Sequence, residues 1–303
     1  MGGVGMRVLW VALAAIAFGS GVPVACGQAS IAPGELVREV VYNEQHDHQH
    51  HGYWQYWVEK RTEAGLSVEE QVETAEGPVA RLVRRGGHPL SPEEEQEEQV
   101  RLLRLASSAE EQARQLKKHD EDEGRIGHIL ALLPTAFEYL YDGEENGYHR
   151  LLFHPNRADV ASSIEARVFH SMSGTLWVDA KAKRLVRLEG HVDENVDFGF
   201  GILGRLYKGG WFRLVRVQVS PTDWKTSSLE VHMNLRALLV KTFARETSEA
   251  RGGFKPVPSG ISLIQGLKLL NQSTQRSEAA ECNVPKTGSG KVLLAPAALA
   301  MHP

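Results

Sequence analysis

Hydrophobic and polar residues alternate through much of the chain between residues 53 and 246. Such alternation is typical of β-strands, because successive side chains point to opposite faces of a sheet. Turn-forming pairs such as Gly77-Pro78 and Asn146-Gly147 separate several of these segments. The pattern predicts strands at 53–61, 66–74, 79–85, 137–141, 148–153, 173–179, 184–192, 211–219, 227–235 and 237–246.

The predicted strands differ in how apolar their two faces are. In one strand Val186 and Leu188 share a face and Arg187 lies on the opposite face, so only one face is apolar and expected to be buried. In another, Trp54 and its opposite-facing neighbour Trp57 are both apolar. Where both faces of the sheet are apolar, both must be buried. We therefore expect helices to cover one face over part of the sheet's width, and the sheet to curve around its other face.

Two regions have helical patterns. Residues 33–45 carry apolar side chains at i, i+1, i+4 and i+5, which predicts a short amphipathic helix. A longer, charged helical arm is predicted at about 91–133. It begins at Ser91-Pro92 with Glu94 in place to close a capping box.

The arm is expected to be interrupted. We predict a first break at Ser107-Ser108, a second at the polar run 119–124, and an end before Pro134. A thin apolar stripe is expected to attach the arm to the sheet; its members are Val100, Leu103 and Leu116. The composition after residue 270 predicts a disordered tail over 271–303, which leaves a single domain over 31–270.

The N-terminus has the order of a secretory signal. Arg7 is followed by an apolar run over 8–18 and a stretch of small residues, which predicts a signal peptide over 1–29 and a periplasmic or otherwise exported protein. The run is too short for a retained membrane span. Either an ordinary peptidase cleaves near residue 27 or 29, or lipidation at Cys26 anchors the protein to a membrane.

Composition and charge narrow the class of protein. The chain has 303 residues, 42% of them hydrophobic and 24% charged, which is typical of a globular protein. Without the signal only Cys282 is left of its two cysteines, so no internal disulfide is expected. Residues 91–125 carry 11 acids and 6 bases, and the absence of a basic stripe argues against a nucleic-acid partner.

One strand pair resembles a known family. The sequence Gly174-Thr175-Leu176-Trp177-Val178-Asp179, followed by Leu185-Val186-Arg187-Leu188, is similar to a strand pair of outer-membrane lipoprotein-sorting proteins of the LolA/LolB-like superfamily. The resemblance covers roughly residues 31–250. It implies an α+β fold, a curved antiparallel half-barrel of about ten to eleven strands covered by a few helices. The arm is longer and more acidic than the family's helical lid, and the arginine near the family's cavity has no match here.

In that family the concave side of the sheet binds a lipid or the acyl part of a lipoprotein. The resemblance therefore implies an apolar cavity. The candidate lining residues are Trp54, Tyr56, Met172, Leu176, Val178, Val217 and Met233.

The sequence has only weak signals of catalysis and metal binding. The run His46 to His51 could hold a metal, but no cysteine or carboxylate at suitable spacing completes a site, and a solvated turn is favoured. Residues 199–204 match a dinucleotide motif in letters only, and Asp193, Glu194 and Asp197 are interpreted as surface acids. No nucleophile elbow is present. We therefore predict a protein that is not an enzyme and has no cofactor or bound metal.

Two hypotheses for function follow. The first is an exported lipid or acyl-protein binder acting in lipoprotein sorting. The second is a periplasmic interaction or regulatory module that binds an envelope protein, with the acidic arm against a basic surface.

Overall fold

We describe residues 31–46, 52–159, 163–198, 204–237 and 241–282 of a computed structural model. The chain separates into two compact units, Met1–Ala32 and Pro33–Pro303, and every helix and strand described below belongs to the second. The His46 to His51 run beyond its first residue, and most of the glycine motif at 199–204, lie outside the described residues, as do the predicted signal and Cys26.

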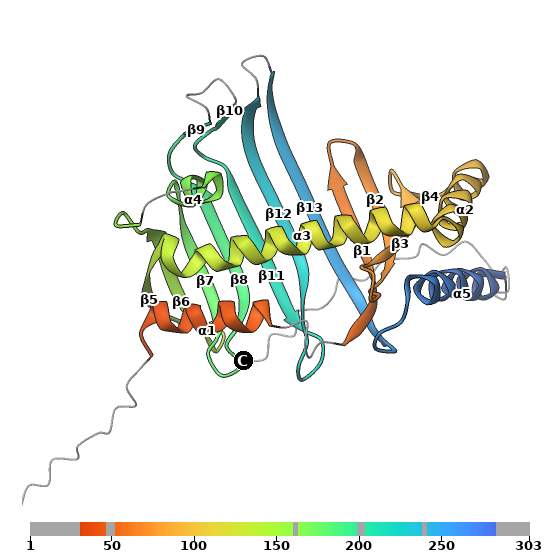
Figure 1. The fold of residues 1–303 in the computed structure, drawn as a ribbon, viewed down its shortest axis with the longest axis horizontal. Coiled ribbons are helices and arrows are strands. Elements are labelled where there is room, and N and C mark those ends of the chain that lie inside the picture. The colour runs from red at the N-terminus through yellow and green to blue at the C-terminus, as the bar shows by residue number, and fades with distance from the viewer. Residues whose placement is uncertain (1–30, 47–51, 160–162, 199–203, 238–240, 283–303) are drawn as a thin grey trace, which may run out of the picture. The chain divides into compact units, whose positions relative to one another are not determined.

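A large antiparallel sheet forms the centre of the fold (Figure 1). Its strand order is β4-β3-β2-β1-β13-β12-β11-β8-β7-β6-β5, with β10 paired to β12 and to β9. The outermost strands of this order do not pair with each other, so the sheet is not closed into a barrel. The bounds are β1 Tyr53–Thr62, β2 Gly65–Val72, β3 Val79–Arg85, β4 His88–Pro89, β5 Phe137–Glu145, β6 Tyr148–Pro155, β7 Met172–Asp179, β8 Arg184–Val192, β9 Val196–Phe198, β10 Gly204–Leu206, β11 Trp211–Gln218, β12 Trp224–Ala237 and β13 Lys241–Val257.

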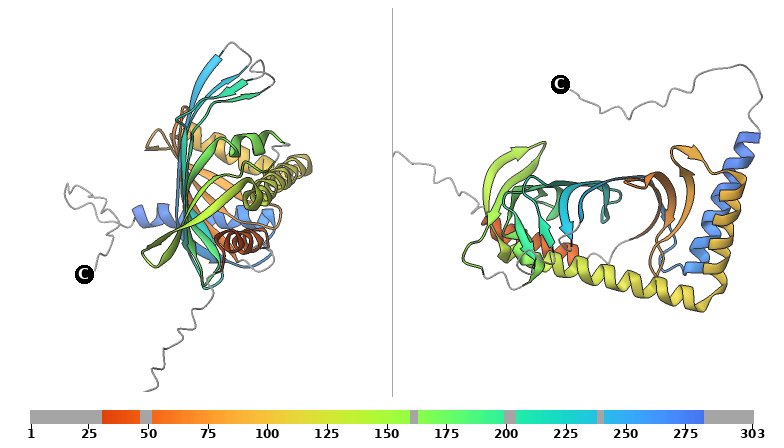
Figure 2. Two further views of the ribbon diagram at one scale, coloured as in Figure 1. Left: turned by 90° about the vertical axis from the view of Figure 1, so that its left-hand side faces the viewer. Right: turned by 90° about the horizontal axis from the view of Figure 1, so that it is seen from above.

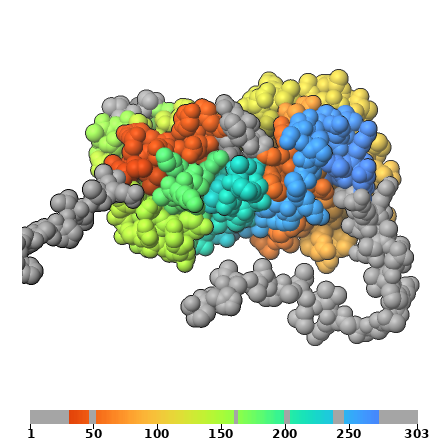
Figure 3. Space-filling model, turned by 90° about the horizontal axis from the view of Figure 1, so that it is seen from below, coloured from red at the N-terminus to blue at the C-terminus, as the bar shows by residue number. Residues whose placement is uncertain are grey.

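Five helices accompany the sheet in the described part of the chain. They are α1 Pro33–Gln45, α2 Pro92–Ser107, α3 Ala109–Ala136, α4 Ile164–Phe169 and α5 Leu263–Cys282. Helices α1 and α3 lie on the same side of the sheet, and α2 and α5 lie beside β2 and β3 (Figure 2). Helices α1 and α5 both reach the molecular surface seen from below (Figure 3). No helix in the described residues is long and apolar enough to cross a membrane.

The main core lies between α1, the end of α3 and strands β5 to β8. Leu36 and Val37 of α1 pack with Leu151 of β6 and Val178 of β7, all nearly without exposed surface. A second core joins α2 and α5 to the β2–β3 hairpin, where Val72 and Val79 meet the leucines of both helices. Burial of these apolar surfaces is the main force that holds the helices to the sheet.

A buried ion cluster fixes the end of α1. The Glu44 carboxylate pairs with Arg184 of β8 at 3.4 Å and with Arg216 of β11, and it accepts a hydrogen bond from the Leu185 amide at 3.3 Å. The three charged side chains are each less than a sixth exposed. A cluster of this kind costs desolvation, but removing one member leaves buried charge without its partner.

The predicted α+β class and the open antiparallel sheet are confirmed, and two details of the strands are corrected. The sheet has three short strands that the pattern did not predict, β4, β9 and β10, because two or three residues are too few to show alternation. Strand β13 continues to Val257 rather than ending at residue 246. Its last part pairs with β1, where Gly252 leaves room for Trp57; a Cβ at that glycine would lie 2.7 Å from the indole ring.

The arm is also corrected. The predicted break at Ser107-Ser108 is confirmed, but α3 runs unbroken through the polar stretch 119–124 and past Pro134. A proline removes one backbone donor, and here the helix ends two residues later. The predicted stripe faces solvent, with Leu103 63% exposed, while Leu102 and Leu105 are buried instead.

The start of the predicted tail is corrected as well. Helix α5 continues through residue 271 to Cys282, so the domain does not end at 270. Residues 272–281 are largely helix formers or small polar residues, and they follow a helical turn anchored by buried Leu267 and Leu270. Residues 283–303 lie outside the described residues.

Candidate functional site

Helix α2 covers the free edge of β3 with its own side chains. Strand β4 pairs only with the end of β3, so the edge before it has open backbone groups. Buried Glu98 accepts a hydrogen bond from the Leu82 amide at 2.8 Å, and the Arg101 guanidinium donates to the Ala80 carbonyl at 2.6 Å. Glu98 and Arg101 also pair at 2.7 Å, which raises the pKa of the arginine. Helix α2 thus replaces a missing strand neighbour.

Helix α3 leaves this corner at an angle set by local capping. Ser108 accepts from the Glu111 amide at 3.3 Å, and the Gln112 side chain donates to the carbonyls of Leu105 and Ala106. These contacts satisfy groups at the end of α2 and the start of α3. These contacts therefore fix the angle between α2 and α3.

The turn between β2 and β3 then contacts α3. Gln115 donates to the Pro78 carbonyl at 2.9 Å. Gly77 has a φ of 95°, and a Cβ there would lie 2.7 Å from the His119 ring. Only glycine combines this backbone conformation with so close an approach.

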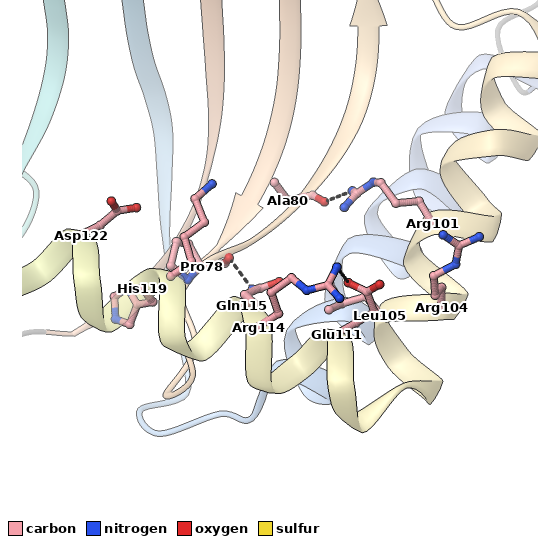
Figure 4. A pocket seen from close by; sticks show the side chains of 11 residues that line it. Pro78, Ala80, Arg101, Arg104, Leu105, Glu111, Arg114, Gln115, His119 and Asp122 are labelled. Carbon is pink, nitrogen blue, oxygen red and sulfur yellow. Dashed lines mark hydrogen bonds and ion pairs between the residues drawn. The ribbon is translucent and has the colours of Figure 1, made fainter. Parts of the chain in front are cut away.

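A pocket of about 500 Å³ fills the angle between α2, α3 and β3 (Figure 4). Four basic side chains and two acidic ones line it, so the positive charges exceed the negative charges by two, with His119 taken as neutral. This excess contrasts with the net negative charge of residues 91–125 as a whole. The lining residues are Pro78, Ala80, Arg101, Arg104, Leu105, Glu111, Arg114, Gln115, Lys118, His119 and Asp122.

The four basic groups of the pocket differ in how they are paired. Arg101 is held by Glu98, and Arg114 pairs with Glu110 at 3.0 Å. Within the described residues, Arg104 and Lys118 have no ion pair. These two side chains are therefore the cations that can meet a bound anion without losing an internal partner.

The seven residues predicted to line an apolar cavity are not brought together at this pocket. Met172, Leu176 and Val178 are buried in the main core, and Met233 packs against it. Val217 is 37% exposed at the surface of β11. None of these lines the pocket between α2, α3 and β3, and their role in acyl binding stays a prediction.

The two aromatic candidates of β1 form a separate small core. Trp54 and Tyr56 pack with Val58, Val219 and Phe254. Burial raises the pKa of Tyr56 to about 12, with a further contribution from the Glu73 carboxylate. The Arg251 guanidinium lies 6.0 Å from the Tyr56 ring and opposes this shift.

A serine of β7, a histidine of β8 and an aspartate directly after β8 lie close together, but not in the order of a catalytic triad. Ser173 Oγ lies 3.0 Å from His191 Nε2 and donates to Asp193 at 2.7 Å. The same His191 Nε2 atom contacts the aspartate at 3.0 Å. In a triad the histidine uses one nitrogen for the serine and the other for the carboxylate. This cluster therefore lacks an oriented base.

The other acids that were interpreted as surface groups are paired with arginines. Asp197 makes two hydrogen bonds with Arg205 at 2.5 and 2.8 Å, which hold the pKa of that carboxyl below its usual value. Glu194 pairs with Arg157 at 3.1 Å. These contacts tie loops and short strands together.

The histidine run begins at the end of α1. The His46 ring stacks on Tyr42, and its Nδ1 lies 2.7 Å from the Tyr42 carbonyl. Among the residues that the structure describes, no three metal-ligating side chains are grouped. The other histidines of the run lie outside the described residues, and the absence of a bound metal stays a prediction.

Comparison with known proteins gives no family for this chain. No family model and no curated protein matches the sequence. A DUF1329 family protein from Desulfovibrio piger is similar in structure with 10% identity and a TM-score of 0.28, over 77% of this chain and 96% of its own. MucB in complex with MucA(peri) is similar with 8% identity and a TM-score of 0.21, over 75% and 100% respectively. At these scores neither structure identifies functional residues, and the LolA/LolB resemblance stays a prediction.

The basic pocket was not predicted from the sequence, although part of its signal is present. Arg101 and Arg104 are three residues apart, and Arg114 and Lys118 are four apart, so each pair shares a helix face. Because the arm as a whole carries more acids than bases, its net charge did not indicate a basic site. Which face turns toward β3 is decided by Glu98, whose burial a sequence pattern does not reveal.

Proposed function

We propose that this protein is an exported, non-enzymatic interaction module that binds an acidic segment of an envelope partner in the pocket between α2, α3 and β3. The observation that carries the proposal is the pairing pattern in that pocket, where Arg104 and Lys118 lack ion-pair partners among the described residues. The charge complementarity is the reverse of the sequence-based hypothesis, in which acids of the arm met a basic surface.

The shape of the site supports a peptide-sized ligand. A volume of about 500 Å³ lies within the range of ordinary ligand pockets. Pro78 and Leu105 supply apolar contacts, and the basic side chains of the lining supply hydrogen-bond donors for carboxylates. Exposed charges steer association and define specificity more than they raise affinity, so we expect binding that weakens strongly with salt.

The test uses labelled acidic peptides and fluorescence anisotropy. A tetraglutamate peptide should bind the full chain better than a tetraglutamine peptide of the same length. The double variant Arg104→Ala/Lys118→Ala should lose about tenfold in affinity, which corresponds to about 1.4 kcal/mol from two partly exposed charges.

Lys117 offers a matched control. It is adjacent to Lys118 on α3, is outside the pocket lining, and approaches Glu121 at 3.9 Å. Lys117→Ala should leave peptide affinity within about twofold of the wild type. Equal binding of the two peptides, or the same loss in Lys117→Ala as in the double variant, would reject the pocket as the acidic-segment site.

The same preparation tests the lipid hypothesis. Native mass spectrometry with organic extraction, on protein purified from its own cell envelope, reports any bound lipid directly. Phospholipid or acylated protein at near one per chain, retained in the Arg104→Ala/Lys118→Ala variant, would favour an acyl carrier over the interaction module. An apo mass together with salt-sensitive peptide binding supports the proposed function.

A further inference from the structure

The sheet has an open face on β7, β8, β11 and β12. Strand register places Ser173, His191, Trp211 and His232 side by side, one on each strand. Their neighbours in sequence, such as Phe212, pack in the main core on the opposite face. The helices that contact this half of the sheet, α1, α3 and α4, belong to that core side (Figure 2). We call the side that carries Trp211 the open face.

A hollow of about 260 Å³ lies on these strands beside Trp211. Its side chains on the open face are Thr175, Glu189, His191, Trp211 and Arg213. Trp211 is 42% exposed, so part of its indole is accessible to a ligand. Its ring stacks with the His232 ring at 6.1 Å and 11°, so a neighbouring strand sets the plane of the indole.

The polar groups of the hollow are fixed by one another. Glu189 Oε1 accepts from Arg187 Nε at 2.9 Å and from Arg213 Nε at 2.5 Å. Although partial burial opposes ionisation, these two arginines lower the pKa of Glu189, so it is a carboxylate at neutral pH. Among the described residues, the hydrogen bonds to Glu189 use only its Oε1 atom, and the one from Arg213 uses only Nε.

This set of groups selects against charged ligands. An anion would meet the ionised Glu189, and a cation would meet Arg187 and Arg213. A neutral ligand with several hydroxyl groups can instead donate to the carboxylate and accept from the guanidinium and from Thr175. An apolar ring face on the same ligand can stack on the indole. Pyranose sugars combine hydroxyl edges with an apolar face.

We propose that the open face binds a pyranose glycan, with one sugar ring on Trp211 and its hydroxyls on Glu189 and Arg213. Gly190 also borders the hollow, and its lack of a side chain leaves room for the Phe212 ring on the core side, because a Cβ there would lie 2.5 Å from that ring. This site is separate from the pocket of α2 and α3 and does not depend on the proposed acidic partner.

The experiment titrates the full chain with chitotetraose, cellotetraose and maltotetraose and follows indole fluorescence and calorimetric heat. We expect saturable binding of at least one oligosaccharide with a dissociation constant of about 1 mM or below. Trp211→Ala should abolish it, and Glu189→Gln or Arg213→Ala should weaken it about tenfold or more.

Trp57 provides the matched control. It is 44% exposed on β1, outside the hollow, so Trp57→Phe removes a similarly exposed indole and should leave glycan affinity unchanged. Circular dichroism and the thermal midpoint establish that each variant is folded. No saturable signal with any of the three sugars up to about 10 mM, or equal loss in the Trp57 variant, overturns the proposal. The Arg104→Ala/Lys118→Ala variant should still bind glycan, which separates this test from that of the proposed function.

Discussion

Glu98 holds the helical arm to the sheet, and its replacement is the sharpest test of the fold described above. The residue is 7% exposed and joins the Leu82 amide of β3 to Arg101 of α2. Glu98→Ala removes the acceptor for that amide. A partly buried amide without an acceptor costs about 1–3 kcal/mol. Because the Arg101 side chain is 52% exposed, water can solvate its charge, and we expect a total loss of about 2 kcal/mol in the free energy of unfolding.

Urea unfolding followed by circular dichroism measures this loss. The midpoint should fall while the slope stays unchanged, because the surface exposed on unfolding is nearly the same. Glu98→Gln keeps an oxygen that can accept from Leu82 and should lose less than about 1 kcal/mol. Glu97, the exposed neighbour on α2, is the control, and Glu97→Ala should stay within about 0.5 kcal/mol of the wild type.

The reasoning is refuted if Glu98→Ala and Glu97→Ala have the same stability. In that case the edge of β3 would not depend on α2 for its hydrogen bonds. The tetraglutamate assay gives a second readout, because α2 carries Arg104. A less firmly held α2 should weaken peptide binding in Glu98→Ala even where the protein is fully folded.

Three further predictions concern stability. Gly77→Ala should cost about 2–4 kcal/mol in urea unfolding from its positive φ and its clash with His119, and a second change, His119→Ala, should restore part of that loss. Glu44→Ala should cost about 3–5 kcal/mol by leaving buried Arg216 without its carboxylate, measured by thermal unfolding; a shift no larger than that of a surface variant would contradict the cluster's role. Burial opposes ionisation of Asp223, but hydrogen bonds from Ser220 and neighbouring groups outweigh the effect of burial and lower the pKa of this carboxyl. The ionised Asp223 therefore stabilises the fold at pH values above the unfolded pKa of about 3.9. This stabilisation is lost as the pH falls through the lower pKa of the folded state. Asp223→Asn should flatten the acid limb of the stability curve, and an unchanged acid limb would argue against this.

The sequence by itself determined most of the local elements, although the short strands β4, β9 and β10 and the helices α4 and α5 were not predicted. Alternation placed ten strands, and apolar spacing placed α1 at Pro33–Gln45. The capping box at Ser91 and the break at Ser108 are both present because a cap depends only on residues a few positions away. Ten strands and two helical regions are consistent with the α+β class that the family resemblance implied.

Tertiary structure alone decided how these elements combine. Strand β1 pairs with β13, which lies nearly two hundred residues later in the chain. The pairing uses backbone groups, which are the same in every residue except proline, so the sequence does not show which strands pair. The apolar residues Val100 and Leu103 were expected to be buried, but the hydrogen bonds of Glu98 to an edge strand turn the other side of α2 inward. The basic pocket and the open face arise the same way, because each joins side chains that are far apart in sequence and adjacent only once strand register and helix orientation are set.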